Sequence, residues 1–222
     1  MSFAVAIDGP AGAGKSTIAK SVSKRLGVIY VDTGAMYRSM ALYLLRNNVN
    51  FENPDEIATV CKGADITIAF EDGVQQVYLN GENVSSLIRT EEISRAASIS
   101  SAHPAVREKL VDLQRKLAST TSLVMDGRDI GTNVLPDAKV KIYLTADASV
   151  RAKRRYDELT AKGEVCDLAV IEADIIKRDR QDMTREIAPL KQAEDAVYVD
   201  TSNMTIPEVE DKILEIVSQK QV

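Results

Sequence analysis

The stretch at residues 9–16, GPAGAGKS, constrains the fold more than any other part of this chain. It fits the pattern G-x-x-x-x-G-K-[ST], in which backbone N–H groups converge on the phosphates of a nucleotide. The apolar run before it, residues 3–7, is typical of a buried strand, and residues 15–26 have the pattern of a helix. Phosphate binding of this kind requires a strand before the loop and a helix after it. The sequence therefore predicts an α/β fold that binds a nucleoside triphosphate.

The same alternation of short apolar runs and helical segments continues along the chain, which predicts a parallel sheet flanked by helices. Further strands are expected at residues 28–32, 122–126, 140–144 and 196–200. Further helices are expected at residues 35–47, 54–63, 104–118, 148–162 and 168–187, and from residue 207 onward. These segments together predict a single domain with a five-stranded core sheet.

Between about residues 62 and 101 the hydrophobic period changes from helical to alternating. Two turn signals, Asp72-Gly73 and Asn80-Gly81, divide this segment into short strands. The sequence thus predicts a small antiparallel β insertion in a core formed by residues 1–61 and 102–222.

Composition limits the partners of the chain. Its net charge of -5 offers no general attraction to nucleic acid. No apolar run approaches the roughly 20 residues needed to span a bilayer, and the N-terminal residues lack the pattern of a secretory signal. Cys61 and Cys166 are far apart and have no metal-ligand spacing, which suits a reducing compartment. We expect a cytoplasmic protein that binds neither nucleic acid nor membranes.

The phosphate loop and its neighbours are the expected ATP site. The residues are Gly9, Pro10, Ala11, Gly12, Ala13, Gly14, Lys15, Ser16 and Thr17. Lys15 should reach the β- and γ-phosphates, and the Ser16 hydroxyl should help to hold Mg²⁺. Asp126, at the end of a predicted strand, should assist the metal directly or through water.

The loop alone does not distinguish a GTPase switch, a motor ATPase and a kinase. A guanine-reading [NT]-K-x-D segment, a D-x-x-G segment after a strand and an LSGGQ-like element are all absent from the sequence. Their absence disfavours the switch and the motor.

Two other segments follow strands at the same edge of the sheet as the phosphate loop, where ligands of open parallel sheets bind. DTGAMYR supplies Asp32, Thr33, Tyr37 and Arg38, which suit a nucleotide or a similar phosphate ester. The alternative is a helix start with a packed tyrosine and a surface arginine. MDGRDIGTNVLPDA places Arg128 beside Asp129, either as a structural ion pair or as part of a site.

Taken in order, GPAGAGKST, DTGAMYR, GRDIGT, VKIYLTA, RAKRR and the run ending in REIAPL resemble the bacterial cytidylate kinases over nearly the whole chain. Departures are mild: Thr33 replaces a serine found in some members, and Asn133 sits where an apolar residue is common. The resemblance implies a P-loop kinase fold. It also implies transfer of the γ-phosphoryl group of ATP, with Mg²⁺, to CMP or dCMP.

The resemblance also implies roles for individual residues. The monophosphate would be bound by Thr33, Tyr37, Arg38, Ser98, Arg107, Arg128, Asp129, Asp182 and Arg185. Asp182 would contact the sugar hydroxyls. Asp129 is our candidate acceptor for the cytosine amino group, and Arg128 or Arg107 would hold it in place or bind the ring's own acceptors. The charge of the transferred group would be neutralised by Lys15, Arg128, Arg151, Arg155 and Arg178.

Arg151 and Arg155 are four residues apart and share a helix face, so both can point into one cleft. A short lid is expected at about residues 155–167, and the chain is expected to act as a monomer. The alternatives are a P-loop kinase with another acceptor (UMP, AMP or shikimate) or a non-catalytic nucleotide-binding switch.

Overall fold

The central sheet has five parallel strands in the order β2-β6-β1-β7-β8. They are β1 (Ala4–Asp8), β2 (Ile29–Asp32), β6 (Leu123–Gly127), β7 (Val140–Thr145) and β8 (Val197–Asp200). All five lie within two residues of an expected run, so the predicted sheet is confirmed in the computed structural model, which describes residues 3–220. Continuous apolar runs form these strands because both faces of a parallel sheet are buried.

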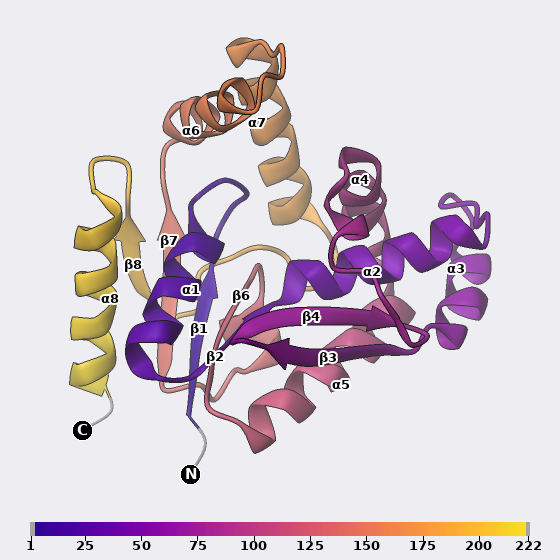
Figure 1. The fold of residues 1–222 in the computed structure, drawn as a ribbon, viewed down its shortest axis with the longest axis horizontal. Helices are drawn as coiled ribbons and strands as arrows, with labels where there is room; N and C mark the ends of the chain where they lie inside the picture. The colour runs from indigo at the N-terminus through magenta and orange to yellow at the C-terminus, as the bar shows by residue number, and fades with distance from the viewer. Residues whose placement is uncertain (1–2, 221–222) are drawn as a thin grey trace.

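Helices cover both faces of this sheet (Figure 1). They are α1 (Lys15–Leu26), α2 (Thr33–Arg46), α3 (Pro54–Val60), α4 (Glu91–Ser100), α5 (Pro104–Thr120), α6 (Ala148–Ala161), α7 (Leu168–Thr184) and α8 (Ile206–Lys220). On one face, Ile18 of α1 and Ile213 of α8 pack against Ile7 and Ile142. On the other face, α2 and α5 bury their apolar sides against β2 and β6. Residues 15–26 form the predicted helix without any shift.

Helix α2 starts earlier than the sequence pattern indicates. Asp32 is its N-cap, and the carboxylate of Asp32 accepts a hydrogen bond from Ala35 N at 2.9 Å. Strand β2 therefore passes directly into the helix without a connecting loop. Thr33 and Arg38 of α2 are consequently fixed at the carboxyl edge of the sheet.

The insertion contains a second, antiparallel sheet in the order β3-β4-β5. Its strands are β3 (Ile66–Glu71), β4 (Val74–Leu79) and β5 (Glu82–Asn83), and the short helical turns η1 (Cys61–Gly63) and η2 (Leu87–Arg89) flank them. Both predicted turns are confirmed, since each has two successive residues with positive φ. Val77 and Leu79 belong to the same hydrophobic cluster as Met36 and Met125, so the insertion and the core share one interior.

Gln75 of β4 joins the insertion to the edge of the central sheet. Its side-chain amide accepts from Asp32 N at 2.7 Å and donates to Asp32 O at 3.2 Å. Strand β2 is an edge strand, so this amide satisfies backbone groups that a neighbouring strand would otherwise pair. The contact fixes Asp32 from the side of the insertion.

We expect Gln75→Leu to lower the free energy of unfolding by about 1–2 kcal/mol, because two hydrogen bonds at a partly buried strand edge are lost. Urea unfolding followed by circular dichroism measures this change. Gln76→Leu is the matched control, since Gln76 lies next in the same strand on its other face and bonds to Asn83 instead. Equal effects of the two substitutions would contradict a specific role for Gln75.

Strands β1 and β7 point toward α6 and α7, which project from the body of the molecule (Figure 1). Helix α6 ends at Ala161, Gly163 turns the chain with a φ of 80°, and Asp167 caps α7. The predicted lid at about residues 155–167 spans this turn, and its limits remain a prediction.

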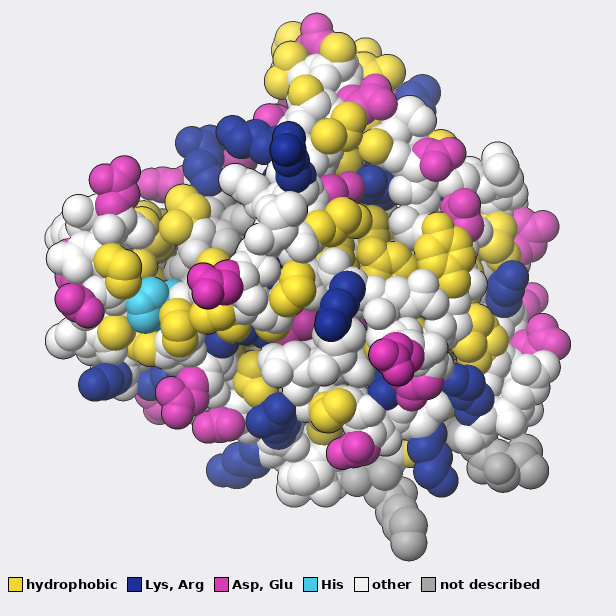
Figure 2. All heavy atoms as spheres, turned by 180° about the vertical axis from the view of Figure 1, so that it is seen from behind, with side chains coloured by type: hydrophobic (Ala, Val, Ile, Leu, Met, Phe, Trp, Pro, Cys, Tyr) yellow, Lys and Arg dark blue, Asp and Glu magenta, His cyan; other side chains and the backbone are white. Residues whose placement is uncertain are grey.

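The surface carries charges of both signs. On the face drawn in Figure 2, Lys and Arg are interspersed with Asp and Glu, and a group of cations lies beside the projecting segment. Among residues 3–220, no helix is both long and apolar enough to cross a membrane.

Candidate functional site

Three carboxylates meet where neighbouring strands of the central sheet end. The register pairs Asp32 of β2 with Asp126 of β6, and Gly127 of β6 with Asp8 of β1. Asp8 and Asp126 are buried, so this edge of the sheet carries negative charge in an apolar setting. Cationic side chains from the segments that follow these strands offset this negative charge.

The phosphate loop leaves β1 at this edge. Its first residue, Gly9, has a φ of 151°, and a Cβ there would lie 1.9 Å from the Leu144 carbonyl oxygen, so no other residue fits. Gly14 is also left-handed, with a φ of 85°, and leads directly into α1. The loop therefore presents its backbone N–H groups at the positive end of that helix.

Lys15 lies under this loop and is almost fully buried. Its Nζ donates to Pro10 O at 2.7 Å, and no carboxylate forms an ion pair with it among the described residues. Burial, together with the nearby Arg128 guanidinium, lowers the pKa of Lys15 to about 7. A buried ammonium that has carboxylates nearby but forms no direct ion pair is suited to receive an anionic ligand.

Ser16 and Asp126 are in direct contact, as the sequence suggested for a metal pair. Ser16 Oγ donates to Asp126 Oδ2 at 3.0 Å, and Tyr30 Oη donates to Asp126 Oδ1 at 2.8 Å. Burial raises the pKa of Asp126 to about 6, and the Asp32 carboxylate adds to the shift. A hydroxyl and a carboxylate are hard oxygen donors of the kind that Mg²⁺ prefers.

A cavity of about 600 Å³ opens beside the phosphate loop and α6. Arg151 and Arg155 both line it, which confirms that they share one face of the helix. Arg154 lines it too, and donates to Thr201 O at 2.7 Å. Apolar side chains of Met204 and Ile206 line it as well, so the lining of the cavity combines cationic and apolar groups.

Arg151 forms more hydrogen bonds and ion pairs than the sequence predicts. It donates to Ala11 O in the phosphate loop and to Ala146 O, both at 2.8 Å, and it pairs with Asp179 of α7 at 2.6 Å. Arg151 thereby ties the loop to both helices of the projecting segment. Arg155 is half-exposed, and its ion pair within residues 3–220 is with Glu158 on its own helix.

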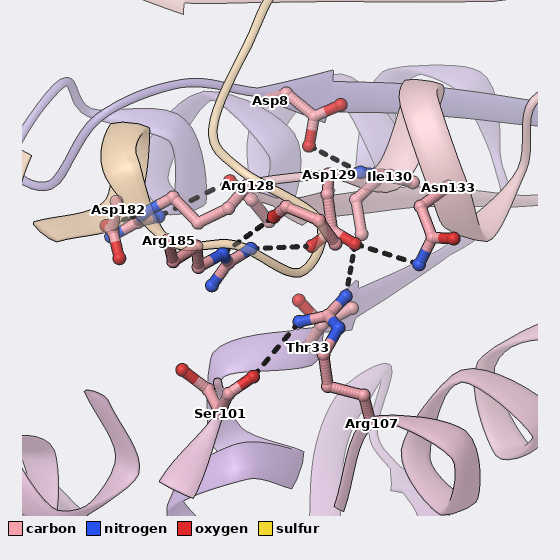
Figure 3. Close-up of polar contacts among 12 residues, drawn as sticks. Asp8, Thr33, Ser101, Arg107, Arg128, Asp129, Ile130, Asn133, Asp182 and Arg185 are labelled. Carbon is pink, nitrogen blue, oxygen red and sulfur yellow. Dashed lines mark hydrogen bonds and ion pairs between the residues drawn. The ribbon is translucent and has the colours of Figure 1, made fainter. Parts of the chain in front are cut away.

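The acidic and basic side chains after β6 pair across the fold, as Figure 3 shows. Asp129 is buried and forms ion pairs with Arg107 of α5 and, at 3.3 Å, with Arg185. Asn133 in the turn η3 (Ile130–Val134) donates to the same carboxylate at 3.1 Å. The expectation that Arg107 could hold Asp129 is met.

The neighbouring residue Arg128 has a different partner. Its Nε donates to Asp182 of α7 at 2.8 Å. The alternative of a structural ion pair between Arg128 and Asp129 is therefore wrong. The two side chains diverge because the chain turns sharply after β6, so each pairs with a residue more than 20 positions away.

The residues of α2 face the same region. Thr33 is buried, and its Oγ1 donates to Asp126 O at 2.7 Å. Arg38 pairs with Asp32 at 3.0 Å, but its buried Nε has no partner among the described residues. The Tyr37 ring lies under the Arg107 guanidinium, 5.8 Å from its centroid. A buried donor that the protein leaves unpaired is a group that a bound acceptor would satisfy.

Two predicted residues are less closely joined to this cluster. Ser98 lies on α4 and is partly buried, and the chain just beyond it contacts the cluster, where Ser101 O accepts from Arg107 at 3.3 Å. Arg178 of α7 lies within electrostatic range of Arg128, Asp182 and Arg155, and burial lowers its pKa. Neither side chain forms a hydrogen bond with another residue in the described part of the chain.

Some residues of the site were not anticipated from the sequence: Asp8, Tyr30, Arg154 and Asp179. A signal existed for Asp8, which ends a buried strand directly before the phosphate loop, as Asp126 ends β6. Nothing local marks Asp179 or Tyr30, because their roles depend on partners distant in sequence.

Comparisons with known proteins show what the whole chain is similar to. A cytidylate kinase of Lactobacillus johnsonii is 52% identical over 217 residues, which is 98% of this chain and 94% of that protein. A cytidylate kinase of Bacillus subtilis is 47% identical over 218 residues, 98% of this chain and 97% of that one.

A solved shikimate kinase from Bacteroides thetaiotaomicron has a TM-score of 0.50 at 13% identity, covering 97% of this chain and 98% of that one, and shares the fold. The cytidylate kinase family profile matches residues 5–219. With a match over almost all of its length, the chain belongs to the cytidylate kinase family.

Proposed function

We propose that this protein transfers the γ-phosphoryl group of ATP to CMP or dCMP. The observation that carries the proposal is the buried cluster of Arg107, Asp129 and Arg185 beside the phosphate loop. A carboxylate accepts well from the exocyclic amino group of cytosine, whereas it would oppose the carbonyl oxygen of uracil. The family of the chain supports the same acceptor.

ATP would bind with its phosphates on the loop and its nucleoside in the adjoining cavity. The apolar side chains of Met204 and Ile206 suit a base, and Thr201 adds polar groups. Arg154 and Arg155 line the same cavity and would offset the charge of the phosphates. The size of the cavity, about 600 Å³, is within the range of small-ligand sites.

Magnesium would accompany the triphosphate, and the residues present fit it. Ser16 and Asp126 would hold the ion or its waters, since their oxygens already lie 3.0 Å apart. When bound, the ion neutralises charge on the β- and γ-phosphate oxygens.

The chain's own residues would act mainly by placing positive charge around the transferred group. Lys15 would approach the γ-phosphate from the loop, and Arg128 would approach from the acceptor side, near enough to affect the pKa of Lys15. Arg155 and Arg178 would close from the projecting helices, while Arg151 keeps α6 and α7 against the loop. No general base is required, because the acceptor is already an anion.

The acceptor would lie between α2, α4, α5 and the segment after β6. Arg38, with its unpaired Nε, is placed to take the phosphate of the acceptor. Asp182 would take a sugar hydroxyl with the oxygen that Arg128 leaves free. Ser98 and Arg107 would contact the base together with Asp129.

Every residue of this site comes from one chain, so a monomer would be sufficient for activity. Cys61 and Cys166 are both free thiols in the structure, which is consistent with a cytoplasmic location.

A steady-state assay tests the function. ADP release with ATP and Mg²⁺ should depend on the acceptor, and kcat/KM should be highest for CMP or dCMP among CMP, dCMP, UMP, AMP and shikimate. Turnover that is equally fast without an acceptor would indicate a nucleotide-hydrolysing switch. A higher kcat/KM for another acceptor would assign a different kinase.

A further inference from the structure

Asp8 joins the phosphate loop to the segment that carries Asp129. Its Oδ1 accepts from Ile130 N and its Oδ2 accepts from Gly131 N, each at 2.7 Å. Figure 3 shows this carboxylate above the backbone next to Asp129. Asp8 therefore caps the turn η3 from a position 122 residues earlier in the chain.

The turn depends on this contact for its first N–H groups. Asn133 N and Val134 N both bond to Asp129 O, so η3 closes on the carbonyl of Asp129. The N–H groups of Ile130 and Gly131 lie before those bonds and have no acceptor within the turn. A buried N–H without an acceptor is costly, so the Asp8 carboxylate fixes where η3 begins.

The position of Asp8 leaves little freedom. It is 5% exposed and directly precedes Gly9, whose close contact with Leu144 fixes the chain. At the turn, a Cβ at Gly131 would lie 3.2 Å from the Lys141 side chain and 3.4 Å from Asp8 Oδ2. Burial raises the pKa of Asp8 to about 6, and its two N–H donors oppose the shift.

We propose that Asp8 is a positioning residue for acceptor choice: it holds the backbone at Asp129 in a fixed place relative to the phosphate loop. Arg107, Arg185 and Asn133 hold the Asp129 side chain, but none of them belongs to the strand that bears the loop. Asp8 alone among these contacts starts on that strand. The proposal rests on the proposed function, in that Asp129 contacts the acceptor base.

Asp8→Asn tests the proposal, because an amide keeps the shape but can accept only one of the two bonds. We expect the CMP-to-UMP ratio of kcat/KM to narrow about tenfold, mainly through a higher KM for CMP. The KM for ATP should change by less than about threefold, since the loop is also held by its glycines and by Arg151. Equal changes in KM for ATP and CMP would overturn the proposal.

A double-mutant cycle shows whether Asp8 acts through Asp129. In an Asp129→Ala background, adding Asp8→Asn should change the CMP-to-UMP ratio by less than about twofold. Independent, additive effects of the two substitutions on the ratio would overturn the proposal. Ile213→Val is the stability control, since it opens a small cavity in the opposite layer and should leave the ratio unchanged.

Gly131→Ala tests the same contact from the turn if Asp8→Asn does not fold. Its Cβ would press on the Lys141 side chain at 3.2 Å, beside Asp8 Oδ2 at 3.4 Å. We expect this to shift the turn and to lower the CMP-to-UMP ratio of kcat/KM, as Asp8→Asn does. A wild-type chain without preference for CMP would overturn the proposed function and this inference together. A CMP-specific wild type with an unchanged ratio in the folded variants would overturn this inference alone.

Discussion

Replacing Lys15 by alanine should reduce kcat roughly 10³- to 10⁵-fold, the range for losing a cation that stabilises a phosphoryl-transfer transition state. Lys15 is 6% exposed, and the one hydrogen bond of its Nζ goes to the Pro10 carbonyl. In the proposed reaction, that ammonium would neutralise charge that gathers on the γ-phosphate. The coupled ADP-release assay with saturating ATP and CMP measures the loss.

The same substitution should leave the fold intact. Burial holds the pKa of Lys15 at about 7, below its ordinary value of 10.5, so the folded state binds this proton less tightly than the unfolded chain does. Stability from this group therefore rises with pH between about 7 and 10.5, and below pH 7 the buried charge weakens the fold. Removing it at neutral pH takes away no stabilising ion pair.

Thermal unfolding of the Lys15→Ala variant, followed by calorimetry, therefore checks that the variant used in the kinetic assay is folded. Lys24→Ala, which removes an exposed lysine from the last turn of the same helix, is the control and should retain normal turnover. A folded Lys15→Ala variant that turns over at a near-normal rate would exclude Lys15 as a catalytic residue.

Replacing Asp129 by alanine should lower kcat/KM for CMP by about 2–4 kcal/mol in transition-state binding, the range for losing a charged hydrogen bond. This corresponds to a loss of about 30- to 900-fold. The value for UMP should fall much less, because uracil offers no amino donor at the same position. The ratio of kcat/KM for CMP to kcat/KM for UMP therefore decreases.

The structure adds a second consequence of this substitution. Arg107 and Arg185 are nearly buried, so Asp129→Ala would leave two guanidinium groups without their shared counter-charge. Loss of one partner of a buried pair typically costs about 3–5 kcal/mol of stability. Asp129→Asn retains the volume of the side chain and one acceptor, and serves as the variant if alanine prevents folding.

Kinetics with both substrates separate the two consequences. If kcat/KM falls by the same factor for CMP and UMP, Asp129 supports the site through Arg107 and Arg185 and does not read the base. Over residues 3–220, Asp129 has no contact through which it would orient Arg128, because Arg128 pairs with Asp182.

The sequence by itself determined the five strands of the central sheet and the place of the phosphate loop between β1 and α1. Residues 15–26 form a helix directly after the phosphate loop, as expected, because the pattern, the glycines and the cap all lie within one short segment. The hairpin turns at residues 72–73 and 80–81 also depend only on adjacent residues, since such a turn needs residues that tolerate positive φ. Such features depend on neighbours in the chain, which the sequence shows.

Only the tertiary structure decided which charged groups pair. The strand order places β6 between β2 and β1, and this brings Asp8, Asp32 and Asp126 to one edge. Arg128 and Asp129 are adjacent in sequence, yet one pairs with α7 and the other with α5, because the turn after β6 directs them apart. The contacts of Gln75 with Asp32 and of Asp8 with the turn at Ile130 join segments 43 and 122 residues apart. Pairing over such separations follows from strand order and packing, which no local pattern encodes.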